Sequence, residues 1–118
     1  MQYTILIYEA QSDFAARLDS NQGPGYWGAY KAYGDALAAS GILVGGGALQ
    51  ADHTATTVRL RDGNRQVQDG PYADTKEQLG GYFVIDVSDL DTALEWAARC
   101  PGASTGVIEV RPLVPMPE

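Results

Sequence analysis

The chain has 118 residues, of which 45% are hydrophobic and 19% charged, a composition typical of one globular domain. Eight basic residues against fifteen acidic ones give a net charge of -7, so we predict that the chain binds neither nucleic acid nor a membrane surface. A single cysteine excludes an internal disulfide, and a single histidine excludes a two-histidine zinc site. We therefore expect no metal and no cofactor.

The first apolar segment, residues 3–8, spans about six residues and has no basic residues before it. Such a segment is too short for a secretion signal and far too short to cross a bilayer. We therefore predict a bacterial cytoplasmic protein.

In the first half of the chain, we predict a strand at residues 3–8, a helical turn at 13–18, a helix at 26–40 and a strand at 42–49. A Gly-Pro-Gly segment at residues 23–25 marks the boundary before the long helix. That helix carries one stripe of apolar and aromatic residues, which recur at helical spacing: Tyr26, Ala29, Tyr30, Tyr33, Ala36 and Leu37.

In the second half, a hairpin is predicted, followed by a charged loop, a strand, a helix and a last strand. These elements are a strand at 54–61, an Asp-Gly-Asn turn at 62–64, a return strand at 66–68, a loop at 69–80, a strand at 81–87, a helix from Ser88 to Pro101 and a strand at 105–113. Ser88 and Asp91 form the predicted capping box of that helix, and its predicted buried stripe is Leu90, Ala93, Leu94 and Ala97.

This order of strands and helices predicts an α+β fold of the ferredoxin-like (split βαβ) type, in which two helices cover one face of an antiparallel sheet. The strands at residues 3–8 and 82–87 are apolar on both faces, so the second face of the sheet also needs a cover. We predict that a second copy of the chain supplies it, in a homodimer whose sheets pack face to face.

Residues 69–81 read Asp-Gly-Pro-Tyr-Ala-Asp-Thr-Lys-Glu-Gln-Leu-Gly-Gly, which resembles the signature of the DGPF (DGPFAETKE) family of YCII-related proteins. Further similar segments follow in collinear order at residues 39–46, 56–59, 90–97, 100–101 and 108–112. The resemblance covers nearly the whole chain. It implies one domain over residues 1–118 and a dimeric α/β-barrel.

The same resemblance implies two kinds of function. Members of the family occur near, or fused to, extracytoplasmic-function sigma factors. More distant relatives are enzymes acting on small aromatic substrates, with a proposed His–Asp pair whose histidine lies near the start of the first helix. This sequence has Tyr26, Trp27 and Tyr30 in that region and no histidine, so the pair cannot be transferred to it.

The loop at residues 69–77 concentrates ionisable side chains, and loops held by a rigid sheet often carry function. Asp69 is the first catalytic candidate, as a general base or a ligand-positioning group, followed by Lys76 and Glu77 as an ion pair or a proton contact. Tyr72 and Asp74 are candidate ligand-binding residues. In the alternative interpretation, Asp-Gly-Pro is a turn and the charges form a solvated rim.

The tyrosines of the long helix are the second candidate group. Tyr26, Tyr30 and Tyr33 are predicted to form the wall of an aromatic-ligand pocket between helix and sheet, with Trp27 as its roof. The alternative is that these rings pack in the core with their hydroxyls at its edge.

Together these features predict a protein that binds a small aromatic or carbonyl-bearing molecule, either as a cofactor-free enzyme or as a binding protein. The pocket would lie between the sheet and the first helix, with the loop at its mouth. The alternative is a non-catalytic interaction or sensor module of a sigma-factor system, which would expose a surface patch beyond the dimer interface.

Overall fold

The computed structural model describes residues 1–73 and 75–117, so the candidate Asp74 lies outside the described residues. The strands are β1 (Gln2–Ala10), β2 (Leu43–Ala48), β3 (Thr56–Arg61), β4 (Asn64–Asp69), β5 (Glu77–Asp86) and β6 (Val107–Pro112). The α-helices are α1 (Gln11–Phe14), α2 (Gly23–Ala39) and α3 (Leu90–Ala98), and 3₁₀ turns cover Ala15–Leu18, Asp52–Thr54 and Pro101–Ala103. Within the described ranges, no helix has the length and hydropathy needed to span a membrane.

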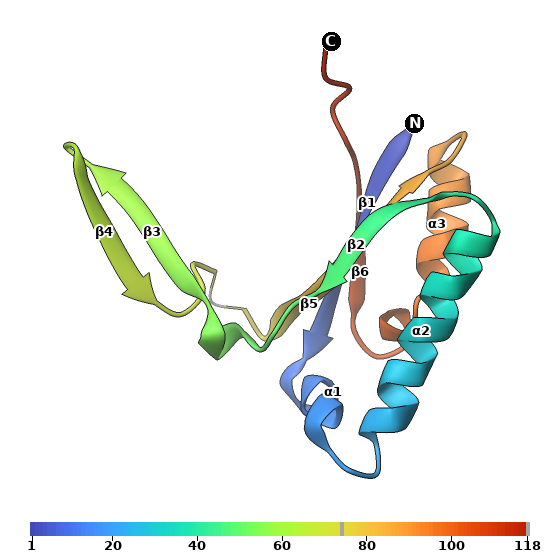
Figure 1. The fold of residues 1–118 in the computed structure, drawn as a ribbon, viewed down its shortest axis with the longest axis horizontal. Coiled ribbons are helices and arrows are strands. Elements are labelled where there is room, and N and C mark those ends of the chain that lie inside the picture. Colours follow the sequence, from blue (N-terminus) through green and yellow to red (C-terminus); the bar gives the residue numbers. More distant parts are fainter. Residues whose placement is uncertain (74, 118) are drawn as a thin grey trace.

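Four of the strands form one antiparallel sheet in the order β2-β5-β1-β6 (Figure 1). The sheet and the helices together confirm the predicted α+β class. Strand β1 lies between β5 and β6, with Ile5 opposite Phe83 on one side and opposite Val110 on the other. The register between β1 and β5 shifts after Ile7, and this places Gly80 in a bulge.

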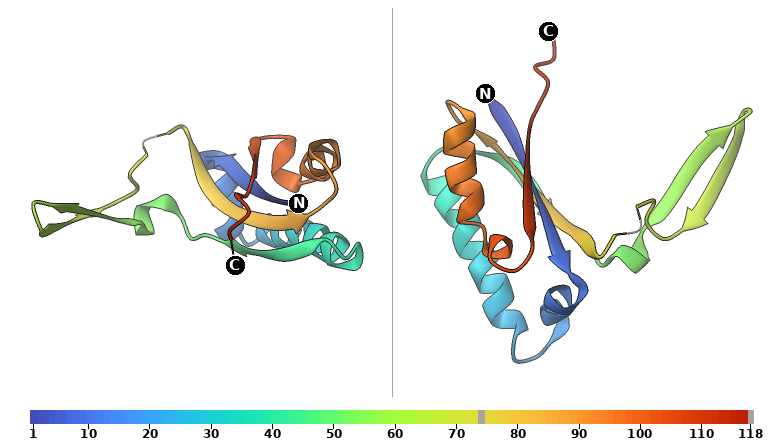
Figure 2. Two further views of the ribbon diagram at one scale, coloured as in Figure 1. Left: turned by 90° about the horizontal axis from the view of Figure 1, so that it is seen from above. Right: turned by 180° about the vertical axis from the view of Figure 1, so that it is seen from behind.

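The core lies between the sheet and the two longer helices, which occupy the same side of the sheet (Figure 2). Alternate residues of β1 are buried against them, starting with Tyr3, Ile5 and Ile7, as expected for a strand with period-two side chains. Helix α2 contributes Tyr33 and Leu37, and further core residues are Ile85, Val87, Ala93 and Cys100.

The structure corrects two details of the second helix. Its N-cap is Asp89 and not Ser88, because the Asp89 carboxylate accepts hydrogen bonds from the backbone N–H of Thr92 at 2.8 Å and from its hydroxyl at 2.7 Å. Its buried stripe is narrower than predicted: Ala93 and Ala97 are buried, whereas Leu90 and Leu94 are exposed.

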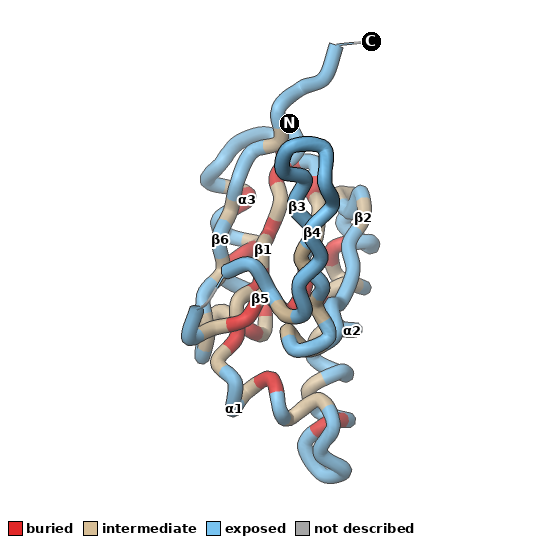
Figure 3. The backbone as a smooth tube through the Cα atoms, turned by 90° about the vertical axis from the view of Figure 1, so that its left-hand side faces the viewer, coloured by how far each residue is buried: buried red, intermediate tan, exposed pale blue. Residues whose placement is uncertain are grey.

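Strands β3 and β4 form a separate two-stranded sheet that projects from the body, and we call it the β3–β4 arm (Figures 1 and 3). Its turn is the predicted one, since Asp62 and Gly63 have φ of 52° and 76°, typical of a tight Asp-Gly hairpin. The molecule measures 47 × 47 × 19 Å with a radius of gyration of 16.1 Å, against about 13–14 Å for a compact chain of this length.

Two predicted boundaries also differ from the structure. Helix α2 starts at Gly23 and so includes the Gly-Pro-Gly segment, since proline fits the first turn of a helix. The charged loop is shorter than predicted, because β4 continues to Asp69 and β5 starts at Glu77.

Candidate functional site

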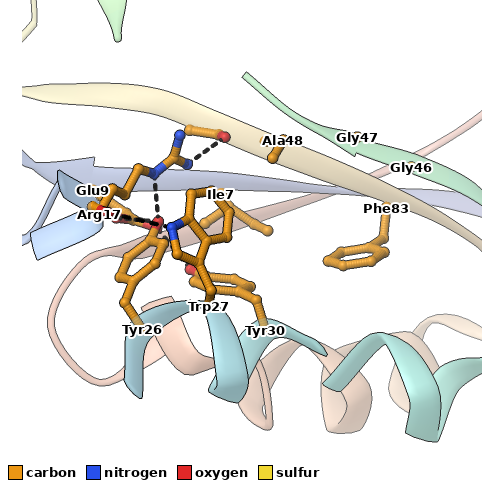
Figure 4. Close-up of a pocket in the computed structure, with 12 residues that line it drawn as sticks. Ile7, Glu9, Arg17, Tyr26, Trp27, Tyr30, Gly46, Gly47, Ala48 and Phe83 are labelled. Atoms are coloured by element: carbon orange, nitrogen blue, oxygen red, sulfur yellow. Dashed lines mark hydrogen bonds between the residues drawn. The ribbon is translucent and has the colours of Figure 1, made fainter. Parts of the chain in front are cut away.

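A cavity of about 220 Å³ lies between α2 and the face of the sheet that the helices cover (Figure 4). Its lining is mostly apolar and aromatic, and four glycines of β2 and β5 leave part of the sheet without side chains. The lining residues are Ile7, Glu9, Arg17, Tyr26, Trp27, Tyr30, Gly46, Gly47, Ala48, Gly80, Gly81 and Phe83. We call this space the α2 cavity.

One acidic side chain, Glu9, borders the α2 cavity and is only 3% exposed. Its carboxylate accepts a hydrogen bond from the hydroxyl of Tyr30 at 2.7 Å and from that of Tyr26 at 2.7 and 3.0 Å to its two oxygens. Figure 4 shows the three side chains converging at one end of the cavity. A buried carboxyl group needs such donors, because losing water without replacement is costly.

The local structure explains why these three residues meet. Glu9 continues the alternation of Tyr3, Ile5 and Ile7 on β1, so its side chain points to the helical side of the sheet. Tyr26 and Tyr30 are four residues apart on α2 and therefore lie on one face of the helix. That face packs over the end of β1, where Glu9 is placed.

Arg17 closes the same end of the cavity. Its Nε donates to the Tyr26 hydroxyl at 2.9 Å, its Nη2 donates to the Gly80 carbonyl at 2.8 Å, and its Nη1 donates to the Leu49 carbonyl. The guanidinium stacks on the Phe14 ring at 3.8 Å from the centroid. The bulge at Gly80 leaves space for it, since an added Cβ there would come within 3.0 Å of Nη2.

The protonation of the tyrosines follows from this setting. Burial, together with the hydrogen bond to Glu9, raises the pKa of Tyr26 to about 12 and raises the pKa of Tyr30 still further. Both phenols are therefore neutral hydrogen-bond donors near neutral pH. Burial likewise raises the pKa of the Cys100 thiol to about 11, so this group does not act as a thiolate nucleophile near neutral pH.

The Tyr26 phenol makes the free energy of unfolding depend on pH in the alkaline range. Because its pKa is raised from 10.0 to about 12, the stabilisation from keeping it protonated is complete below pH 10 and is lost as the pH rises through 12. We expect the free energy of unfolding to fall less steeply between pH 10 and pH 12 for Tyr26→Phe than for the wild type. Urea unfolding across this range measures the slopes. Gly28→Ala, which changes no titratable group, is the control and should keep the wild-type slope.

Of the four residues predicted to form an aromatic pocket, the structure brings Tyr26, Trp27 and Tyr30 to the α2 cavity. Tyr33 is not among the lining residues. Its ring is buried in the core, and its hydroxyl donates to the carbonyl of Trp96 at 2.7 Å. Tyr33 therefore fits the alternative of core packing.

The predicted position of the 69–77 loop at the mouth of this cavity is wrong. Asp69, at the end of β4, and Lys76 are both exposed. Tyr72 is also exposed, and its ring centroid lies 5.2 Å from the Arg59 guanidinium. Glu77 is half-buried and pairs with Ala10 of β1. The described part of the loop instead borders a separate hollow of about 490 Å³, whose lining includes Tyr8, Leu49, Pro71, Ala73, Thr75 and Leu79.

The sequence interpretation missed Glu9 and Arg17. Glu9 carried a usable signal, since it is an acidic residue in phase with the buried positions of an apolar strand. Arg17 carried none, because its role depends on a bulge and on carbonyls far away in the sequence.

In the part of the chain that the structure describes, no group of three or more His, Cys, Asp or Glu side chains is placed to bind a metal ion.

Comparison with known proteins identifies the family. The chain matches the family model described as the YCII-related domain over residues 1–117. The chain belongs to the YCII-related domain family. The chain is also similar to the uncharacterized protein R00369 of Rhizobium meliloti (strain 1021), with 51% identity over 61 residues, which are 50% of this chain and 49% of that protein. The aligned segment thus spans about half the length of that curated relative.

A solved structure shares the fold of this YCII-related chain. It is 5-chloro-2-hydroxyhydroquinone dehydrochlorinase (TftG) from Burkholderia phenoliruptrix AC1100, in complex with 2,5-dihydroxybenzoquinone. The TM-score is 0.57 with 15% sequence identity, and the alignment covers 97% of this chain and 94% of the other. At this identity the similarity concerns the fold alone.

Proposed function

We propose that this YCII-related protein binds a small, uncharged ring compound with a hydroxyl group in the α2 cavity, and that Glu9 accepts its proton. The observation that carries the proposal is a buried carboxylate at the end of an otherwise apolar, aromatic-lined cavity. A flat ring fits against the backbone of Gly46, Gly47 and Gly81, and the hydroxyl of the ligand points to Glu9.

The arrangement suits cofactor-free proton transfer. In that step the O–H bond of the ligand breaks, a new O–H bond forms on Glu9, and the electron pair stays on the ligand as an enolate or phenolate. The neutral phenols of Tyr26 and Tyr30 donate hydrogen bonds to the Glu9 carboxylate, and Arg17 adds a positive charge beside Tyr26. TftG, which shares the fold, is a dehydrochlorinase solved in complex with 2,5-dihydroxybenzoquinone, so this fold can hold a small oxygenated ring.

Three finer assignments belong to the same proposal. The signature at residues 69–81 supports membership of the DGPF subfamily, and the strand order β2-β5-β1-β6 supports a ferredoxin-like protomer. The uncovered face of the sheet presents Leu6, Tyr8, Tyr82, Val84 and Val107, which supports a homodimer that packs sheet on sheet. A role in a sigma-factor system stays a prediction from the resemblance.

The two tryptophans allow a direct test with phenol as the probe. Trp27 lines the α2 cavity, whereas Trp96 packs against the core. Trp96→Phe therefore leaves Trp27 as the only tryptophan, and Trp27→Phe is the matched control. We expect phenol to change the Trp27 fluorescence saturably and to leave that of Trp96 unchanged.

Fluorobenzene is the matched ligand, because it has the shape of phenol and cannot donate a hydrogen bond. A hydrogen bond to a charged group contributes about 1.5–3 kcal/mol, so fluorobenzene should bind at least about tenfold more weakly than phenol. Equal responses to both ligands, or none to either, would contradict the role of Glu9.

A further inference from the structure

The β3–β4 arm has one apolar face. Val58 and Val67 lie opposite each other in the hairpin, and Leu60 lies two residues along β3 from Val58, so all three side chains share a face. Their exposed fractions are 59% for Val58, 55% for Val67 and 65% for Leu60. Figure 3 shows the exposed backbone of the arm in front of the buried core of the body.

The opposite face of the arm is polar. Thr57, Arg59, Gln66 and Gln68 share it, and the Arg59 guanidinium lies over the Tyr72 ring. Arg65, opposite Leu60, and Asp69, opposite Thr56, border the three apolar side chains on their own face, as the polar rim of an interface does. A two-stranded hairpin alone is marginally stable in water, so an unburied apolar face is a reason to expect a partner.

Charge indicates what kind of partner fits. The arm, residues 56–69, holds three of the eight basic residues and two of the fifteen acidic ones. It therefore carries a formal charge of +1, while the rest of the chain carries -8. A second copy of this chain thus offers the acidic surface that the arm would be drawn to.

We propose that the apolar face of the β3–β4 arm docks on a second copy of the same chain. This inference rests on the homodimer proposed above and adds a contact to it, because the arm extends beyond the body and lies outside its four-stranded sheet. The arm then packs against the partner, and this contact orders the hairpin. The ligand site in the α2 cavity contains no residue of the arm.

Two neighbouring substitutions test the docking. Val67→Lys adds a positive charge to the apolar face, and Gln66→Lys adds the same charge to the polar face of the same strand. Both side chains are exposed in the single chain, so neither change should prevent folding. By sedimentation velocity over a wide concentration range, we expect Val67→Lys to raise the dimer dissociation constant at least about tenfold and Gln66→Lys to change it less than about twofold.

Each outcome of this experiment decides the question. If the wild type forms a dimer that both variants weaken equally, or that neither variant weakens, the arm contact is overturned. The sheet-to-sheet dimer then still stands. A monomeric wild type at all concentrations overturns both, and the arm would then be free for another protein or a membrane. Phenol binding, measured in parallel with Val67→Lys, reports on the α2 cavity separately.

Amide hydrogen exchange gives a second readout. In a free hairpin the backbone N–H groups of residues 56–69 exchange fast at every protein concentration. We expect their exchange to slow as the wild type is concentrated, and to slow less for Val67→Lys. Fast exchange at all concentrations would contradict docking.

Discussion

Glu9→Ala is expected to lower the free energy of unfolding by about 3 kcal/mol. The substitution leaves the hydroxyls of Tyr26 and Tyr30 without their acceptor in a buried site, and each such loss costs about 1–3 kcal/mol. Urea unfolding at neutral pH measures the change. Glu95→Ala, at an exposed position of α3, is the control and should shift stability by less than about 0.5 kcal/mol.

Glu9→Gln separates the structural part of this effect from the functional part. Glutamine keeps an oxygen that accepts from the tyrosines but has no negative charge to accept a proton from a ligand. We expect a loss of about 1 kcal/mol in unfolding free energy, together with at least about a tenfold loss of phenol affinity. If Glu9→Ala unfolds with the wild-type free energy, the carboxylate does not organise this site.

Gly106→Ala is expected to destabilise the protein by about 3 kcal/mol, which lowers the melting temperature by about 10 °C in a chain of this size. An added Cβ at this position would collide with the backbone carbonyl of Tyr8 on β1 and would lie 3.1 Å from the carbonyl of Gly102. Neither backbone atom can rotate away as a flexible side chain would. The turn before β6 would have to move off β1.

Gly28→Ala is the matched control for this prediction. An added Cβ on Gly28 meets no described heavy atom within 4 Å, and the residue lies in the interior of α2. Alanine should therefore stabilise the helix by about 0.5–1 kcal/mol. Differential scanning calorimetry compares the two variants. A melting temperature for Gly106→Ala within a few degrees of the wild type would contradict the tight approach of the turn to β1.

The parts of the fold that could be predicted from the sequence depend on local patterns. The alternation in β1, the spacing in α2 and the Asp-Gly turn each act within a few residues, and each was located close to its observed place. The detachment of β3 and β4 could not be predicted, because the pattern of a strand does not show which sheet it joins. The cap of α3 was misplaced by one residue, since Ser88 and Asp89 both suit an N-cap and only the backbone geometry distinguishes them.

The candidate site could be predicted only in part, again because a sequence pattern acts within a few residues. Tyr26 and Tyr30 share a helix face, so their joint position at a cavity followed from spacing. The charged loop at residues 69–77 is dense in ionisable groups and was therefore placed at the cavity, but its described residues border the hollow beside Tyr8 and not the α2 cavity. Glu9 and Arg17 meet Tyr26 only through tertiary packing, which the sequence pattern does not contain.

A two-dimensional NMR titration of the labelled protein with phenol and short keto acids tests the central claim most directly. The account predicts saturable amide shifts centred on residues that line the α2 cavity, such as Ile7, Gly46 and Phe83. Shifts from none of the compounds, or shifts confined to the hollow beside Tyr8 and Pro71, would contradict a ligand site in the α2 cavity.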